Sequence, residues 1–279
     1  PDELTYQTHM PPLLERWMGL HVNWLGPIRR PRHPRSLARF GLLGIHPARR
    51  LAEGRFQSKR ARALFAGVAA HSMLPLEHWG SAAFGLVLGI AGHAVGWPVA
   101  RGGAQKLTDA LAAHLFTLGG KIISARPVRT LDELPSSRVV LCDLTPRQLL
   151  EIAGERLSPF YRKSLGRYRY GVGAFKLDWA LSGPVPWKAA ECARAAAVHL
   201  GGTLEEIAFS EAAAWRGECV EKPFVLLAQP SLFDASRAPE GKHTLWGYCH
   251  VPHGFTFNMT DRIEKQIEQM IGGSLFPQQ

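Results

Sequence analysis

The residues best placed to hold a ligand lie in one short turn, residues 96–104, with the sequence Gly-Trp-Pro-Val-Ala-Arg-Gly-Gly-Ala. Gly102 and Gly103 have no side chains, so a flat ligand could approach the backbone there closely. Arg101 adds a positive charge, and the start of the following helix would offer unpaired N–H groups to a phosphate or a carbonyl. The turn therefore predicts an anion or cofactor site. A glycine turn that only leads into an amphipathic helix is the alternative, because two adjacent glycines are a weak motif.

A second set of chemically useful residues alternates along residues 243–251. In a strand, Thr244, Trp246, Tyr248 and His250 fall on one face, and small or apolar residues fall on the other. Aromatic rings with polar tips suit the wall of an apolar cavity that holds a few convergent polar groups. Packing of both faces into a core is the alternative.

Residues 173–181 show the same alternation. Leu177 and Trp179 would lie on an apolar face, while Lys176 and Asp178 would lie on the opposite, polar face. We therefore predict a strand with one buried face and one face that carries both charges.

Other residue types that often do chemistry are scattered. The four cysteines contain no C-x-x-C pair, so we expect neither a zinc cluster nor a disulfide framework. We expect the protein to occupy a reducing compartment. These cysteines, which we expect to be small buried residues, are Cys142, Cys192, Cys219 and Cys249. Three histidines lie in apolar helical sequence, where we expect hydrogen-bonded core residues rather than metal ligands: His71, His78 and His93.

The formal charge of +10 over 279 residues favours an anionic partner, such as nucleic acid, a phosphate-bearing cofactor or an anionic membrane face. Solubility alone is the alternative explanation. Much of the charge lies in residues 27–62, where basic and apolar residues are interleaved. This pattern favours peripheral contact with a membrane, or a solvated helical face, over nucleic-acid binding, because no reader motif is present.

No segment of the sequence has the roughly 18–20 apolar residues of a membrane span, and the start lacks the pattern of a signal peptide. We therefore expect a cytoplasmic protein, peripheral to the membrane where residues 27–62 bind it. The chain lacks an initiator Met, so we expect a fragment of a longer protein.

The elements that must position these residues follow from apolar periodicity and from helix signals. Before the turn we expect helices over residues 4–26, 61–73 and 82–95. After it we expect a helix over 105–118, strands over 121–128 and 138–143, and a helix over 147–153. The leucines of 105–118 form an apolar stripe that should pack onto something, and Thr145 should cap the helix that follows it.

The second half of the chain predicts strands over residues 173–181, 224–229 and 243–251. An alanine-rich helix is expected over 187–198, and Thr203 with Glu206 predicts a capping box for the next helix. Asp261 should cap a last helix in which Ile263 and Ile267 lie one turn apart, before a disordered tail at 272–279. The fold class we expect is α+β (α/β), with a mixed or antiparallel sheet covered by helices.

Several of these blocks resemble the bacterial phytoene-dehydrogenase-related flavoproteins, which belong to the amine-oxidase-like FAD-dependent oxidoreductases. The resemblance covers most of residues 60–268. The matching blocks are the turn 96–104, Tyr-Arg-Tyr-Gly-Val-Gly-Ala-Phe-Lys-Leu-Asp-Trp-Ala-Leu at 168–181, Pro-Val-Pro-Trp at 184–187, Val-His-Leu-Gly-Gly-Thr at 198–203, Pro-Phe-Val-Leu-Leu-Ala-Gln-Pro-Ser-Leu-Phe-Asp at 223–234, and Arg-Ala-Pro-Glu-Gly-Lys-His-Thr-Leu-Trp-Gly-Tyr-Cys-His-Val-Pro at 237–252.

The resemblance implies an FAD cofactor whose flavin side is lined by Trp97, Arg101, Gly102, Gly103 and Val128. The family's amino-terminal strand, Gly-rich turn and helix grip the FAD pyrophosphate, and this sequence has no counterpart of them. Its carboxyl-terminal flavin segment is also without a counterpart. We therefore expect weak FAD binding, or none, by this chain alone.

The resemblance also implies a substrate domain over the flavin ring. Its polar cavity groups would be Lys176, Asp178, Trp246, Tyr248 and His250, with no acid or base assigned among them. The implied function is oxidation or desaturation of an apolar, isoprenoid-like substrate by an FAD-dependent oxidoreductase, present here as an incomplete chain. A non-catalytic remnant of such a flavoprotein that binds a membrane or a partner is the alternative.

This interpretation divides the chain into four functional segments. Residues 1–95 would be the helical part of the substrate domain, and residues 156–260 its sheet and further helices. Residues 96–155 would be a slice of the FAD-binding domain, and residues 261–279 a terminal helix and tail.

Overall fold

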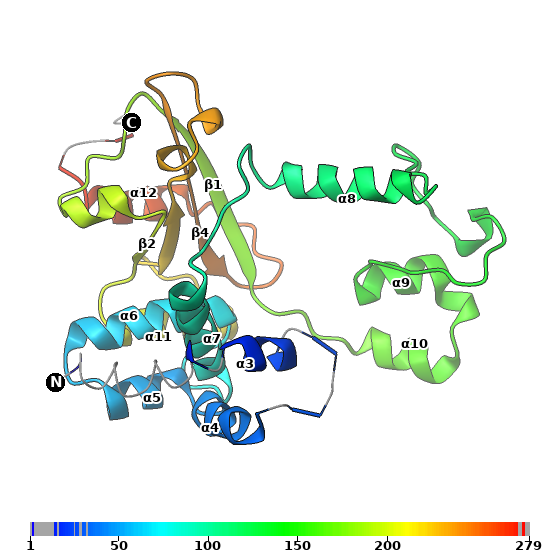
Figure 1. The fold of residues 1–279 in the computed structure, drawn as a ribbon, viewed down its shortest axis with the longest axis horizontal. Coiled ribbons are helices and arrows are strands. Elements are labelled where there is room, and N and C mark those ends of the chain that lie inside the picture. The colour runs from blue at the N-terminus through cyan, green and yellow to red at the C-terminus, as the bar shows by residue number, and fades with distance from the viewer. Residues whose placement is uncertain are drawn as a thin grey trace. The chain divides into compact units, whose positions relative to one another are not determined.

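Alternating apolar and polar residues in the second half of the chain fold into one antiparallel sheet, shown in Figure 1. Its strands lie in the order β1 (Gly173–Leu181), β4 (His243–Val251), β3 (Val225–Ala228) and β2 (Ala197–Leu200). The three predicted strands of this half are confirmed, and so is the α+β fold class.

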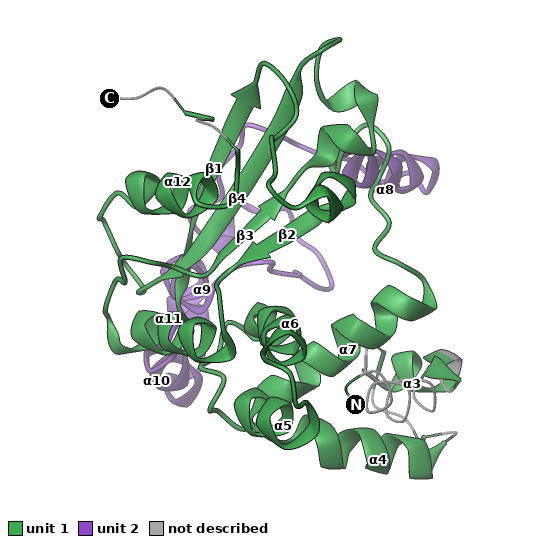
Figure 2. Ribbon diagram, turned by 90° about the vertical axis from the view of Figure 1, so that its left-hand side faces the viewer, with its two compact units in different colours: residues 1–104, 171–279 green, residues 105–170 purple. Residues whose placement is uncertain are grey.

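The computed structural model describes residues 2, 14–15, 17–24, 26–27, 30–31, 33–272 and 275–276. They form two compact units, unit 1 from residues 1–104 and 171–279 and unit 2 from residues 105–170 (Figure 2). Much of the predicted helix 4–26 and most of the tail 272–279 lie outside the described residues, as do Arg29 and Arg32. The four functional segments stay a prediction, because the two units reflect packing and not function.

One face of the sheet packs against α12 (Thr260–Glu268). Ile263 and Ile267 are fully buried against the apolar side chains of β3 and β4, as their one-turn spacing predicts. The predicted cap at Asp261 is wrong. Met259 holds the N-cap position without a side-chain cap, and Asp261 falls in the first turn, where its charge still suits the helix dipole.

The remainder of unit 1 is a layer of helices rich in alanine and leucine. It contains α3 (Trp17–Trp24), α4 (Pro34–Gly44), α5 (Ala48–Arg55), α6 (Lys59–Ala69), a 3-10 turn at Ala70–Ser72, α7 (Ser81–Ala94) and α11 (Leu204–Arg216). The predicted helices 61–73 and 82–95 and the capping box of Thr203 with Glu206 are confirmed.

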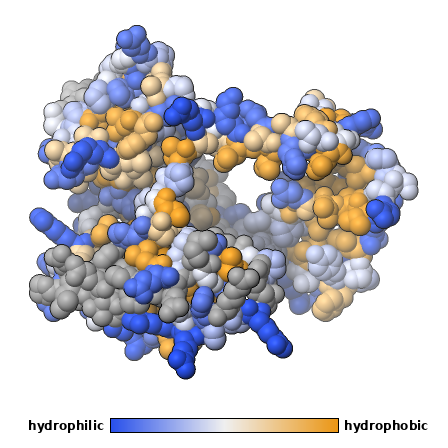
Figure 3. All heavy atoms as spheres, viewed as in Figure 1, coloured by the Kyte–Doolittle hydropathy of each residue, from blue (hydrophilic) through white to orange (hydrophobic). Residues whose placement is uncertain are grey.

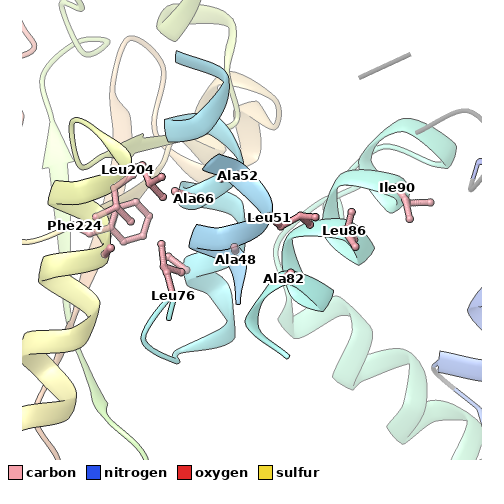
Figure 4. Close-up of a cluster of buried hydrophobic side chains, with 14 of the residues drawn as sticks. Ala48, Leu51, Ala52, Ala66, Leu76, Ala82, Leu86, Ile90, Leu204 and Phe224 are labelled. Carbon is pink, nitrogen blue, oxygen red and sulfur yellow. The ribbon is translucent and has the colours of Figure 1, made fainter. Parts of the chain in front are cut away.

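The core of this helical layer combines alanines with larger leucine, isoleucine and phenylalanine side chains (Figure 4). A Cβ on Gly85 would lie 3.0 Å from the Phe65 ring, so the glycine allows α6 and α7 to approach closely. On α11, Leu204 packs beside Phe224, which precedes β3. The core of the helical layer therefore extends to the residue that precedes β3.

The alanine-rich segment 187–198 does not form the predicted helix. Ala190–Arg194 is a short 3-10 turn, and Ala197–Leu200 is β2, which pairs with β3 along the sheet. Alanine favours a helix by less than about 1 kcal/mol per residue over most residue types. Ladder hydrogen bonds and the burial of Leu200 outweigh this preference.

Unit 2 is helical in the residues that the structure describes. It contains α8 (Gln105–Thr117), α9 (Pro146–Ala153) and α10 (Pro159–Gly166), with 3-10 turns at Leu131–Glu133 and Gly154–Arg156. The predicted helix 105–118 and the Thr145 cap of α9 are confirmed. The predicted strands 121–128 and 138–143 are wrong: both segments are irregular, because unit 2 supplies no partner strand.

The apolar side chains of unit 2 lie largely in solvent. Leu111 of α8 is 73% exposed, and Leu141 of the second irregular segment is 91% exposed. Figure 3 shows orange, apolar atoms over the positions of α8 and α9. The predicted packing of the α8 leucine stripe is therefore absent from the described residues, where Leu107, Leu111, Leu115 and Leu118 are all exposed.

Replacing Ile267 with Ala is expected to lower the free energy of unfolding of unit 1 by about 2–5 kcal/mol, because it leaves a cavity between α12 and the sheet. Chemical denaturation followed by circular dichroism measures the change. Lys265→Ala on the exposed side of α12 is the matched control, and it should change stability by less than about 0.5 kcal/mol. Equal effects of the two substitutions would contradict this packing.

Candidate functional site

The most buried ionisable pair of the described chain joins α11 to the sheet. Glu211 lies on the apolar side of α11, one turn after Ile207, and is only 1% exposed. One of its carboxylate oxygens, Oε2, lies 2.6 Å from Nδ1 of His250 on β4. The other oxygen, Oε1, and Nε2 of His250 are buried without a hydrogen-bond partner among the described residues. Unpaired buried polar atoms are costly, so this pair is a strong candidate for function.

Burial is the main influence on Glu211. It raises the pKa of this carboxyl above its usual range, and the hydrogen bond from His250 opposes the rise only in part. Tyr248 lies next to His250, with 5.5 Å between the ring centroids. Burial, followed by the nearby Glu211 carboxyl, raises the pKa of the Tyr248 hydroxyl as well. Both groups are therefore held toward their protonated, neutral forms.

Two further histidines meet beside this pair. His199 of β2 and His71 of the turn after α6 place their Nε2 atoms 3.2 Å apart, so one ring donates a hydrogen bond and the other accepts it. A Cβ on Gly67 of α6 would lie 2.9 Å from His199 Nδ1, so only glycine leaves room for the ring. Phe224 contacts the same ring edge-on. The His199 ring is thus held between Gly67 of α6 and the Phe224 ring.

Both imidazoles are neutral near pH 7. Burial, helped by the neighbouring His71, lowers the pKa of His199 to about 4. Burial, followed by the nearby His250, also lowers the pKa of His71. A neutral imidazole can donate and accept hydrogen bonds but attracts no counter-ion.

The predicted substrate residues all lie on the sheet face opposite α12. Lys176 is opposite Tyr248 and Asp178 is opposite Trp246 in the pairing of β1 with β4. Lys176 also forms an ion pair with Asp178, and its ammonium lies 5.4 Å from the centre of the Trp246 ring. The structure therefore brings these four residues and His250 onto one surface, which is buried at the His250 end and more open at the Trp246 end.

Two neighbouring cavities are lined by residues of the helical layer, and one of them also by residues of the sheet. The first, of about 410 Å³, lies between α5, α6 and α7 and is lined mainly by apolar residues such as Leu51, Phe56 and Leu86. The second, of about 280 Å³, is lined by Ala197 and His199 of β2 and by residues of α6 and α11. They share the wall residues Leu64, Val68 and Trp97.

The diglycine corner is held by the loop before β4. The Gly102 N–H donates a hydrogen bond to Asp234 Oδ2 at 2.6 Å, and Arg237 Nη1 donates one to the Gly102 carbonyl at 2.9 Å. Both glycines have positive φ, and a Cβ on Gly103 would lie 2.3 Å from Arg237 Nη1. The group that approaches the Gly103 backbone closely is therefore Arg237 of the chain itself.

The other predicted cofactor residues are placed separately. Trp97 packs over Gly92 near the end of α7, where it lines both cavities. Arg101 is exposed and has no hydrogen bond to any described residue. Val128 belongs to unit 2, whereas Trp97 and residues 101–103 belong to unit 1.

Sequence reasoning missed Glu211 and the partnership of His71 with His199. Glu211 could have been found from the sequence, because it is an acid within the apolar stripe of residues 204–214. A glutamate is almost never fully buried unless it is paired. The histidine pair had no local signal, since its members are 128 residues apart in sequence.

Comparison of the sequence with protein-family models finds no match, and comparison with curated proteins also finds none. Among the described residues, no helix combines the length and the apolar character that crossing a membrane requires. The same residues contain no group of three or more His, Cys, Asp or Glu side chains suited to hold a metal ion.

Acidification is expected to destabilise unit 1 through His199, because its pKa is depressed in the folded state. The stability from neutral His199 is fully present above the ordinary pKa of 6.5 and is lost as pH falls toward about 4. Loss over this interval amounts to about 3 kcal/mol. Glu211 has the opposite effect on stability as pH falls, because burial favours the protonated form of its carboxyl group.

The measurement is the unfolding free energy at several pH values for wild type and His199→Gln. The variant should show a shallower loss between pH 6.5 and about 4, while His78→Gln, at an exposed histidine, should follow the wild type. Parallel curves for wild type and His199→Gln would show that His199 does not carry this dependence.

Proposed function

We propose that this chain forms the substrate-binding part of an FAD-dependent oxidoreductase, related to phytoene dehydrogenases, that oxidises or desaturates an apolar, isoprenoid-like substrate. The observation that carries the proposal is the apolar cavity of about 410 Å³ between α5, α6 and α7. Its walls continue through Leu64, Val68 and Trp97 to the edge of the sheet. The resemblance of residues 96–104 and 237–252 supports the same family.

The role of the chain is to bind and orient the substrate away from water. Side chains such as Leu51, Phe56 and Leu86 would remove its apolar surface from solvent, which contributes about 25 cal/mol per Å². A bound flavin would supply the oxidising chemistry by accepting a hydride from a C–H bond. The neutral Tyr248 hydroxyl and the neutral imidazoles would orient any oxygen atom of the substrate.

The residues of the corner fit a flavin in part. The exposed Arg101 guanidinium suits a phosphate or a flavin carbonyl, since it forms charge-assisted hydrogen bonds with either. Gly102 and Gly103 fit less well, because Asp234 and Arg237 hydrogen-bond the N–H and the carbonyl of Gly102 and Arg237 fills the space beside Gly103. The proposal therefore expects the pyrophosphate grip to come from a segment that this sequence does not contain.

Fusion of the chain to a nucleotide-binding half of this superfamily is expected to give a protein that retains FAD, while the chain alone retains little or none. Arg101→Ala should weaken retention by roughly tenfold, because it removes a charge-assisted hydrogen bond. Flavin absorbance after gel filtration measures retention.

Arg194→Ala, at another exposed arginine of unit 1, is the matched control and should retain FAD like the parent fusion. A folded fusion that stays colourless would count against the proposed function.

A membrane-binding role, without catalysis, is the second candidate, and one surface of the helical layer favours it. Leu42 and Ile45 are exposed at the end of α4, while Arg35 and Arg39 are exposed on the same helix. Apolar side chains beside basic ones suit an anionic lipid surface. A cytoplasmic protein peripheral to the membrane accordingly stays our prediction.

This second candidate predicts salt-sensitive co-sedimentation with vesicles that contain anionic lipid. The double variant Arg35→Glu, Arg39→Glu should bind at least tenfold more weakly, since each basic residue near the surface contributes about 1 kcal/mol. The control Arg194→Glu, Lys242→Glu makes the same change in net charge elsewhere in unit 1. Equal loss in both variants would point to net charge alone and against a surface on α4.

A further inference from the structure

Two neighbouring cavities of unit 1 differ in chemical character. The first is walled mainly by the apolar side chains of α5, α6 and α7. The second is smaller and ends at β2, where His199 is the ionisable side chain in its lining. Leu64, Val68 and Trp97 line both, so the two cavities are neighbours on either side of these three side chains.

The combined space suits a small molecule of moderate length. The volumes of about 410 and 280 Å³ together fall in the range of roughly 300–1,000 Å³ that ligand pockets occupy. Apolar walls over most of this length favour a hydrocarbon chain, since such a chain leaves no polar group unpaired.

His199 is the source of polarity in the second, smaller cavity. Its Nε2 is engaged with His71, whereas Nδ1 has no hydrogen bond to any described residue and is not among the fully buried polar atoms. The ring is fixed by the Gly67 niche and by Phe224, so Nδ1 offers a hydrogen bond in a set direction. If His71 donates to His199 Nε2, Nδ1 carries the proton and donates; in the opposite tautomer Nδ1 accepts.

We infer that the two cavities bind one amphiphile, with its hydrocarbon chain between α5, α6 and α7 and a neutral hydroxyl or carbonyl oxygen at His199. The inference rests on the proposed function and specifies its substrate class. The two tautomers of the His71–His199 pair match the two oxygen types, because one donates to a carbonyl and the other accepts from a hydroxyl.

A carboxylate end group is a poorer fit at this position. The imidazoles of His199 and His71 are neutral near pH 7, so they provide no ion pair for an anion. The buried Glu211–His250 pair lies close enough for His250 to influence His71 electrostatically. Arg55 and His93 line the first cavity and not the second, so a fatty acid would place its carboxylate in the first cavity.

The test compares three probes that share one isoprenoid chain: the alcohol farnesol, the hydrocarbon farnesene and the acid farnesoate. Calorimetric titration of the full chain, without flavin, measures each dissociation constant. Farnesol is expected to bind about 5–10-fold more tightly than farnesene, the effect of one hydrogen bond in a buried site. Val68→Trp at the shared wall should abolish binding of both.

His199→Leu should lower the affinity for farnesol to about that for farnesene, while His78→Leu should keep the preference. Equal affinities of wild type for farnesol and farnesene would overturn the inference, and so would tightest binding of farnesoate with loss in Arg55→Leu. The wild-type comparison decides even if a variant fails to fold. Because no flavin is present, a negative result here is independent of the flavin-retention result.

Discussion

The contact of α6 with the His199 ring, at the edge of the sheet, is the constraint on which the rest of unit 1 depends. Gly67 leaves space for the His199 ring, and this contact brings the helical layer to the sheet. Glu211 and His250 make a second connection, from α11 to β4. Between these two polar contacts the core is apolar, so the polar groups fix which helix faces which strand. Both cavities are lined in part by residues of α6.

Local sequence patterns correctly predicted those helices and strands whose own residues show the periodicity of the element. The alternation in 173–181 and 243–251 gave correct strands, because each has one face buried against α12 or the helices. Segment 187–198 was predicted as a helix from alanine content, and partner-strand pairing overrides that preference. Segments 121–128 and 138–143 have strand-like composition but lack a partner in unit 2, and composition alone cannot supply one.

Of the candidate site, only the residues on the sheet could be predicted from the sequence. Lys176, Asp178, Trp246 and Tyr248 share a face because strand periodicity requires it, whatever covers that face. The Asp234 and Arg237 contacts to Gly102 join residues more than 130 positions apart, and no local rule anticipates them. They change the interpretation of the corner, because a glycine required for close approach of a ligand and one required for close approach of an arginine have the same sequence signature.

The position of β1 at the border of the sheet has a further consequence. A border strand of nine residues is long enough to recruit a strand from another molecule, which is the usual route to aggregation. Lys176 and Asp178 place charges along its outward face, and desolvating them against a neighbouring sheet would be unfavourable. The same two residues that the substrate hypothesis assigns to a cavity would thus also disfavour pairing of β1 with a strand of another molecule.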